Sequence, residues 1–216
     1  MRFKDRADAG RELARGLVRR VGAPCVVGAI PRGGVAVALP VAEALGAPLV
    51  VVNAQKLTAP IAPEFAFGAI DEDGEMIVDH GSVRDLGLGP DDVERARRRA
   101  WEILRARLDS DGGARLTALL PRGVVLVDDG LATGLTMLAG VRYARRHGAT
   151  AIRVAVPCAA REAARLLRLE VEDLVCPVVD PHFAAVGCYY EDFSQVTDEQ
   201  VARLLARAPG RAGPGR

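Results

Sequence analysis

The chain has 216 residues, of which 50% are hydrophobic and 26% are charged, and its formal net charge is +1. This length is enough to bury a substantial core and predicts one domain. A near-neutral charge gives no bulk attraction to nucleic acid or to an anionic membrane, so neither is an expected partner. The sequence also lacks an apolar run near the roughly 20 residues that a membrane-spanning helix needs.

Targeting and cysteine usage both favour a cytoplasmic protein. The first residues lead directly into a charged amphipathic pattern rather than into a secretory signal. The cysteines are scattered and show no C-x-x-C spacing, which favours free, mostly buried thiols over disulfides or a zinc site. They are Cys25, Cys158, Cys176 and Cys188.

Hydrophobic periodicity predicts alternating helices and strands along most of the chain. Asp5 or Asp8 is the expected N-cap of the first helix, and Pro40 should kink the second or make its first turns irregular. The expected helices run to about residue 20 and over 35–45, 91–108, 135–146 and 161–168, with a last helix after a capping box over 197–200, and the expected core strands cover 25–30, 48–54, 124–127, 151–156 and 174–178.

One segment departs from this alternation. Residues 65–70 and 75–78 flank Asp71-Glu72-Asp73-Gly74, whose Asp-Gly pair predicts a hairpin turn. Residues 58–63, with two prolines, and residues 80–90 are predicted loops.

Taken together, these elements predict an α/β protein with a doubly wound, mainly parallel central sheet and a β-hairpin excursion. A single domain is expected over residues 1–208, followed by a flexible tail over 209–216. The arginines of the helix over 91–108 could form a phosphate or nucleic-acid patch, but the acids around them favour a solvated helix face. They are Arg95, Arg97, Arg98 and Arg99.

The chemistry of the chain is concentrated in residues 124–136, where a buried strand is followed by Asp128 and Asp129 and then by a small-residue turn into a helix. Ligands of open α/β sheets bind at the carboxyl ends of strands. Alone, the two acids allow a metal site, an acid–base pair or simple strand-end polarity. Adjacent strand residues point to opposite faces, so the two carboxylates are poorly placed to share one proton. At a strand end, both can accept ribose hydroxyls directly or through Mg²⁺.

The turn that follows the acids suits a phosphate, because helix-start amides and the hydroxyls of Thr133 and Thr136 can surround an anion. The run of four hydrophobic residues, two acids, three variable residues and Thr-Gly-x-Thr resembles the signature of the type I phosphoribosyltransferases. The resemblance implies the matching fold, Mg²⁺ held at Asp128 and Asp129, and a site for phosphoribosyl pyrophosphate. Its residues in this run would be Asp128, Asp129, Gly130, Leu131, Ala132, Thr133, Gly134, Leu135 and Thr136.

The resemblance also assigns the turn after the first core strand. Alone, Pro31-Arg32-Gly33-Gly34 is a tight turn before a helix. In the family this place holds the pyrophosphate loop, often with a non-proline cis peptide, here expected between Pro31 and Arg32. Arg32, Gly33 and Gly34 would then contact the pyrophosphate.

Lys56 follows the second predicted strand and alone would be a solvated side chain. In the family a basic residue here contacts the pyrophosphate, so the implied catalytic set is Arg32, Lys56, Asp128 and Asp129. Residues 57–88 match in place the mobile loop that closes over the reaction and excludes water.

The acceptor end is less defined. The resemblance places a hood over residues 179–196, an aromatic-rich stretch in which Phe183, Tyr189 and Tyr190 could stack a planar, purine-like acceptor. The alternative is that these rings seal the C-terminal helix against the sheet. Several purine-type members carry an acid immediately before the Thr-Gly pair, whereas this chain has Ala132.

Over nearly its whole length the chain resembles stand-alone, uncharacterised bacterial phosphoribosyltransferase-like proteins. This resemblance rests on Pro31–Gly34, on Pro63–Ile70 and on Tyr189–Phe193. The implied activity is Mg²⁺-dependent phosphoribosyl transfer with release of pyrophosphate, and a homodimer is the expected assembly. Two alternatives stay open: a regulator that binds the activated sugar without turnover, and a phosphate-ester hydrolase with Asp128 as nucleophile.

Overall fold

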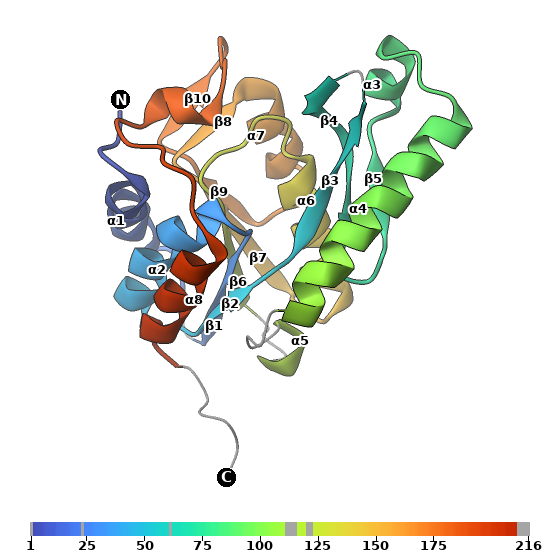
Figure 1. Ribbon diagram of the computed structural model, residues 1–216. Coiled ribbons are helices and arrows are strands. Elements are labelled where there is room, and N and C mark those ends of the chain that lie inside the picture. The colour runs from blue at the N-terminus through green and yellow to red at the C-terminus, as the bar shows by residue number, and fades with distance from the viewer. Residues whose placement is uncertain (1, 23, 61, 111–115, 120–122, 211–216) are drawn as a thin grey trace.

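A five-stranded parallel sheet forms the centre of the computed structural model, with strand order β2-β1-β6-β7-β9 (Figure 1). Because the order reverses between β1 and β6, the loops after these two strands meet at the carboxyl edge, where open α/β sheets bind ligands. The structure describes residues 2–22, 24–60, 62–110, 116–119 and 123–210. The central strands are β1 (Cys25–Ala29), β2 (Leu49–Val51), β6 (Gly123–Val127), β7 (Ala151–Ala155) and β9 (Asp173–Val175).

Helices cover both faces of this sheet, which confirms the predicted doubly wound fold. Alternate strand side chains point to opposite faces, so Val27 and Val125 pack on one helical layer while Val26 and Leu126 pack on the other. None of the described helices is both long enough and apolar enough to cross a bilayer. The first layer holds α1 (Arg6–Leu17), α2 (Gly33–Leu45) and α8 (Asp198–Arg207), and the second holds α5 (Leu116–Leu119), α6 (Leu135–Arg146) and α7 (Arg161–Arg168).

Helix ends follow the predicted signals. Asp5 caps α1 by accepting a hydrogen bond from the Asp8 amide at 2.7 Å, which selects one of the two candidate caps. Thr197 and Gln200 form the predicted capping box of α8. Pro40 lies inside α2, whose helical assignment is unbroken from Gly33 to Leu45. Of the predicted tail, residues 211–216 lie outside the described part of the chain.

A second, antiparallel sheet stands beside the first at the right of Figure 1, and contains β3 (Ala54–Ala59), β4 (Ala62–Asp71) and β5 (Met76–Val78). One of its faces packs Ala54 and Ala69 against Leu135 and Ala139 of α6. The other face packs on α4 (Pro90–Ser110). The predicted Asp-Gly turn joins β4 to β5, so the hairpin prediction is confirmed.

Both predicted loops around this sheet are regular structure, and those predictions are corrected. Residues 58–63 belong largely to β3 and β4, and the pairing of the two strands shifts register at Thr58. Residues 80–90 contain α3 (His80–Asp85), which Asp79 caps by accepting hydrogen bonds from the Gly81 and Ser82 amides at 3.1 and 3.2 Å. The segment predicted to be a mobile loop therefore consists of strands and a short helix.

Two predicted strands are each divided between sheets. The strand predicted over 48–54 ends at Val51, and β3 begins at Ala54 in the second sheet. The strand predicted over 174–178 ends at Val175, and β10 (Val178–Asp180) pairs instead with β8 (Cys158–Ala160), an element that was not predicted. An apolar pattern continues across such a switch, so periodicity alone does not reveal it.

The β4–β5 turn is anchored to the C-terminal end of α6. Asp71, only 1% exposed, has its Oδ2 atom 2.6 Å from the guanidinium of Arg146. The Glu72 carboxylate accepts hydrogen bonds from the Tyr143 hydroxyl at 3.1 Å and from the Asn53 amide at 2.7 Å. These polar contacts fix the second sheet relative to the central one.

Replacing Arg146 with Met should lower the free energy of unfolding by about 1–3 kcal/mol, because the buried Asp71 carboxylate loses its charged partner. Arg142→Met is the matched control, since Arg142 pairs with Glu170 at the surface and should cost less than about 1 kcal/mol. Chemical unfolding measures both. Equal losses in the two variants would contradict the anchoring role.

Candidate active site

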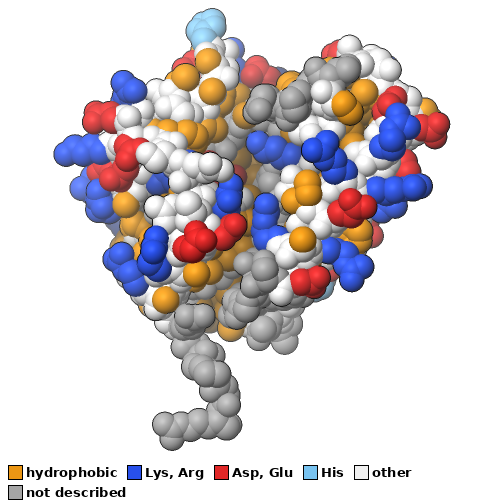
Figure 2. Space-filling model, in the orientation of Figure 1, with side chains coloured by type: hydrophobic (Ala, Val, Ile, Leu, Met, Phe, Trp, Pro, Cys, Tyr) orange, Lys and Arg blue, Asp and Glu red, His pale blue; other side chains and the backbone are white. Residues whose placement is uncertain are grey.

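A cavity of about 320 Å³ opens where the loops after β1 and β6 meet. It receives side chains from the central sheet, from β3 and from α4. On the face shown in Figure 2, Lys and Arg side chains lie along the hollow between the two parts of the molecule. The predicted residues that line the cavity are Arg32, Gly33, Lys56, Asp128, Asp129, Gly130, Leu131, Ala132, Thr133, Gly134 and Thr136.

The loop after β1 presses directly against the loop after β6. The peptide between Pro31 and Arg32 is cis, as the resemblance implied. Gly33 begins α2, and a methyl group there would overlap the carboxylate of Asp129 and lie 2.9 Å from Nε of Arg6. A side chain at this position would therefore have to displace the Asp129 carboxylate or Arg6. Gly34 is similarly close to the backbone of Asp128.

The loop after β6 is held on its other side by β8. The amide of Leu131 donates a hydrogen bond to the Cys158 carbonyl at 2.9 Å, and the Ala160 amide donates to the Leu131 carbonyl at 2.8 Å. Leu131 is only 2% exposed, so its side chain anchors the loop at the wall of the cavity that it shares with its neighbours. Gly130 lies against Cys158 and Val186. The loop thus reaches the cavity with its backbone already fixed.

Helix α6 starts at the cavity, and its N-cap residue is Gly134, which has no side chain to cap the helix. Gly134, the residue before the helix, has φ of +78°, a left-handed conformation that favours glycine. The Leu135 amide is 3.4 Å from Oγ1 of Thr133. The N-terminus of a helix carries partial positive charge and free amide donors, so this end of the cavity suits a phosphate.

Asp128 lies at the bottom of the cavity. Its Oδ1 accepts a hydrogen bond from the Asp129 amide at 2.7 Å. Burial raises the pKa of the Asp128 carboxyl well above its usual range, the Asp129 charge raises it further, and Lys56 opposes both. A cation brought into the cavity would favour the ionised carboxylate.

Asp129 is held by Arg6, which the sequence did not reveal as a site residue, and by Tyr190, for which another role was predicted. Its Oδ2 accepts a hydrogen bond from Nε of Arg6 at 2.8 Å, with 11% of the Arg6 side chain and 17% of the Asp129 side chain exposed. The guanidinium of Arg6 lies 3.9 Å from the centre of the Phe193 ring. The Tyr190 hydroxyl donates to the Asp129 carbonyl at 2.6 Å. Arg6 gives no local sequence signal, because its partner is 123 residues away.

Three cationic side chains line the cavity from three different elements. Arg32 extends toward the start of α8, where it lies 3.6 Å from Asp198. Lys56 is exposed and lies within β3, which corrects its predicted position just after a strand of the central sheet. Arg107 of α4 is the third, and it was not predicted. The structure thus brings Arg32 and Lys56 together with both acids, as expected.

The predicted acceptor residues do not line this cavity. Tyr190 is 1% exposed and braces Asp129, so the prediction that it stacks an acceptor is corrected. Tyr189 is 9% exposed, and its hydroxyl donates a hydrogen bond to Asp180 at 2.6 Å. Its buried ring is therefore not available to stack on an acceptor. Phe183 stacks on Tyr189 with ring centres 5.1 Å apart. For Phe183 an acceptor contact stays a prediction.

The two carboxylates fit a hard cation in part. No group of three His, Cys, Asp or Glu side chains gathers as a metal site among the described residues. Mg²⁺, however, is commonly held by one or two carboxylates together with substrate phosphates and waters. Asp128 and Asp129 offer two carboxylates of this kind, although one oxygen of each already accepts a hydrogen bond.

Comparison with known proteins assigns the family. The family described as phosphoribosyl transferase domain matches residues 2–192. Two curated proteins of Mycobacterium tuberculosis, each named "Putative phosphoribosyl transferase", are 39% identical over 207 residues, which cover 95% of this chain and 47% of theirs. The crystal structure of TT1426 from Thermus thermophilus is similar at 40% identity and a TM-score of 0.73, covering 97% of this chain and 100% of that one.

This chain belongs to the phosphoribosyl transferase domain family. Its α/β architecture with a mainly parallel central sheet agrees with that assignment. The chain spans about half the length of the curated relatives that it matches.

Gly33→Ala tests the close approach of the two loops. The added methyl group should displace Asp129 or Arg6 and lower the free energy of unfolding by about 1–3 kcal/mol. Gly22→Ala is the control, since a methyl group there would have no neighbour within 4 Å. Chemical unfolding measures stability, and the Nε–H resonance of Arg6 reports the displacement. An unchanged resonance with unchanged stability would contradict the packing.

Proposed function

We propose that the chain transfers a 5-phosphoribosyl group from phosphoribosyl pyrophosphate to a nucleophilic acceptor, with Mg²⁺, and releases pyrophosphate. The observation that carries the proposal is the contact between Gly33 and Asp129 at the point where the strand order reverses. This contact brings the loop over residues 31–34, two carboxylates and the N-terminus of α6 to one cavity. The chain belongs to the phosphoribosyl transferase domain family.

The polarity of the cavity supports one orientation of the donor. Its 5-phosphate would lie at the start of α6, on the amides near Thr133 and Gly134. The ribose hydroxyls would face Asp128 and Asp129, which accept hydrogen bonds. The pyrophosphate would lie on the loop over residues 31–34, within reach of the cationic side chains. Those side chains are Arg32, Lys56 and Arg107.

The arrangement also suits the charges that develop during transfer. As the bond from the anomeric carbon to pyrophosphate breaks, positive charge grows on the ribose and negative charge grows on the leaving group. The carboxylates stabilise the former, and Arg32 and Lys56 stabilise the latter. Bound Mg²⁺ would neutralise part of the pyrophosphate charge. The 5-phosphate contacts provide binding energy remote from the reacting bond, which orients the ribose.

Arg6 would act as a positioning residue in this reaction. It fixes the carboxylate of Asp129 through one oxygen and leaves the other for the ribose. The packing of its guanidinium on Phe193 and its hydrogen bond to the Ser194 carbonyl hold it in place. The ribose-facing end of the cavity is therefore preorganised before the donor binds.

No described residue of the cavity makes the acceptor purine-specific. At Ala132, where several purine-type members have an acid, this chain offers a methyl group. An acceptor that enters here either needs no proton removed or loses it to another group. A purine-like acceptor, a homodimer and a cytoplasmic location stay predictions.

The double variant Asp128→Asn with Asp129→Asn should lower the affinity for phosphoribosyl pyrophosphate with Mg²⁺ by at least about 100-fold, because two charged hydrogen-bond acceptors are lost. Calorimetry measures the binding, and thermal unfolding shows whether the variant is folded. Asp173→Asn, at the surface beside Arg20, is the control. Full affinity in a folded double variant would refute the donor site.

Turnover separates the proposed transferase from the two alternatives. Purine, pyrimidine and amine acceptors are each incubated with the activated sugar and Mg²⁺, and pyrophosphate release is measured. Release that requires an acceptor supports the transferase. Binding with no release for any acceptor would favour a sensor, and turnover of simple phosphate esters would favour a hydrolase.

A further inference from the structure

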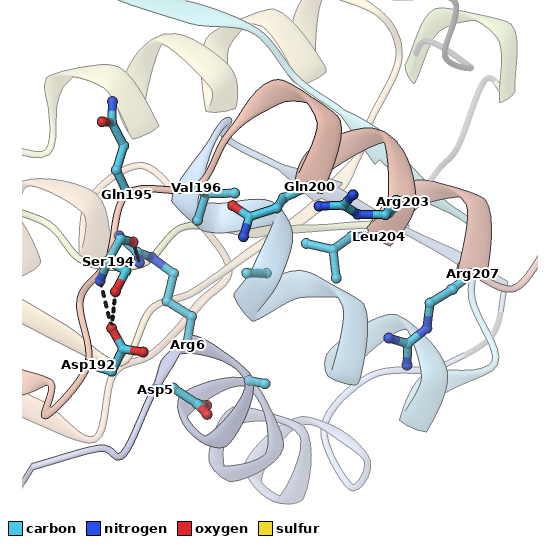
Figure 3. A pocket seen from close by; sticks show the side chains of 12 residues that line it. Asp5, Arg6, Asp192, Ser194, Gln195, Val196, Gln200, Arg203, Leu204 and Arg207 are labelled. Atoms are coloured by element: carbon cyan, nitrogen blue, oxygen red, sulfur yellow. Dashed lines mark hydrogen bonds between the residues drawn. The ribbon is translucent and has the colours of Figure 1, made fainter.

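A second cavity, of about 490 Å³, lies between α1, α2, α8 and the segment 192–196 (Figure 3). We call it the α8 cavity. Its described lining residues are all different from those of the donor cavity, the 320 Å³ space described above. Its volume lies within the range of about 300–1,000 Å³ that is common for small-molecule sites.

Two arginines of α8 give this cavity its charge. Arg203 and Arg207 are four residues apart, so they extend from the same face of the helix. A hydrogen bond from the Thr197 side chain chiefly lowers the pKa of the Glu199 carboxyl, and the charge of Arg203 lowers it further. Arg207 is 4.0 Å from Glu43 in a solvent-exposed pair. Neither guanidinium is thus held by a close, buried partner among the described residues. Two guanidinium groups on one face of a helix supply the positive charge that attracts the dianionic head of a phosphate monoester.

The acids that line the α8 cavity are engaged in local turns. Asp5 accepts the Asp8 amide at 2.7 Å, and Asp192 accepts the Ser194 amide at 2.9 Å. Figure 3 shows the second of these contacts. Both carboxylates keep their negative charge, but the three arginines among the described lining residues, Arg6, Arg203 and Arg207, outnumber them.

The remaining walls suit an uncharged body attached to the phosphate. Ala7, Ala36, Val196 and Leu204 supply apolar surface, and the amide of Gln195 adds polar groups at the rim. Inorganic phosphate alone would leave this surface uncovered. A nucleoside monophosphate has both a dianionic head and a largely planar body of suitable size.

Two ionic contacts connect the α8 cavity to the donor cavity. Arg6 lines the α8 cavity, donates one hydrogen bond to the Ser194 carbonyl at 2.8 Å, and donates another to Asp129. Arg32 of the donor cavity pairs with Asp198 at the start of α8. A ligand seated in the α8 cavity can therefore reach Arg6, which also holds Asp129 of the donor cavity.

We propose that the α8 cavity binds a small phosphate monoester and, through Arg6, weakens binding of the activated sugar. A phosphate there competes with Asp129 for the Arg6 guanidinium. Asp129 then carries an unpaired negative charge beside the site of an anionic donor. The second half of this proposal rests on the proposed function, whereas the binding site itself does not.

The binding half is tested by calorimetry with adenosine 5′-monophosphate, adenosine and inorganic phosphate. The monophosphate should bind, and Arg203→Gln with Arg207→Gln should weaken it by at least about tenfold. Arg19→Gln, at an exposed arginine just after α1 that does not line the cavity, is the charge control and should bind normally. Binding that is unchanged in the double variant, or equally tight for phosphate or adenosine alone, would overturn the site.

The coupling half is tested by titrating phosphoribosyl pyrophosphate with Mg²⁺ in the presence of saturating monophosphate. The affinity should fall at least about fivefold in the wild type and stay unchanged in the Arg203→Gln, Arg207→Gln variant. An equal fall in that variant would mean direct competition in the donor cavity and would overturn the coupling. If the activated sugar fails to bind at all, the proposed function fails, while the monophosphate titration still decides the site.

Discussion

The close approach of Gly33 to Asp129 is the constraint on which the rest of the site depends. A side chain at Gly33 would displace the Asp129 carboxylate that contacts it across the two loops. The approach is possible because β1 and β6 are neighbours at the reversal of strand order, and because residue 33 has no side chain. This contact sets the distance between the loops after β1 and β6, which form two walls of the donor cavity.

The contact is stabilised from three directions. Arg6 of α1 and Tyr190 of the hood both hold Asp129, and β8 holds Leu131 on the other side of the same loop. The N-terminal segment pairs with the hood, since the Phe3 amide donates to the Tyr189 carbonyl at 2.8 Å. The aromatic rings of the hood therefore support the donor site from outside, and of the hood only Val186 is among the described lining residues of the cavity. Within the hood, Tyr189 and Tyr190 are buried, whereas Phe193 stays 37% exposed.

The central fold was predictable because its signals are local. Helices α6 and α7 have their predicted bounds, and the loop after β6 has its expected place, since a buried strand, a turn and a helix start are adjacent in sequence. The cis peptide and Gly33 came from the family resemblance. Arg6 and Arg107 could not be found, because each reaches the site from a distant element. The hairpin of the second sheet was predicted, but β3 was not separated from β2, because the apolar run continues through the change of sheet at Asn53.

The lining residues of the donor cavity therefore indicate which donor it binds, but they do not indicate the acceptor. The most direct measurement is a crystal structure with phosphoribosyl pyrophosphate and Mg²⁺ bound. The account predicts the 5-phosphate on the amides at the start of α6, the ribose hydroxyls at Asp128 and Asp129, and the pyrophosphate on the loop over residues 31–34. A sugar phosphate bound in the opposite orientation, or with no contact to either acid, would contradict it.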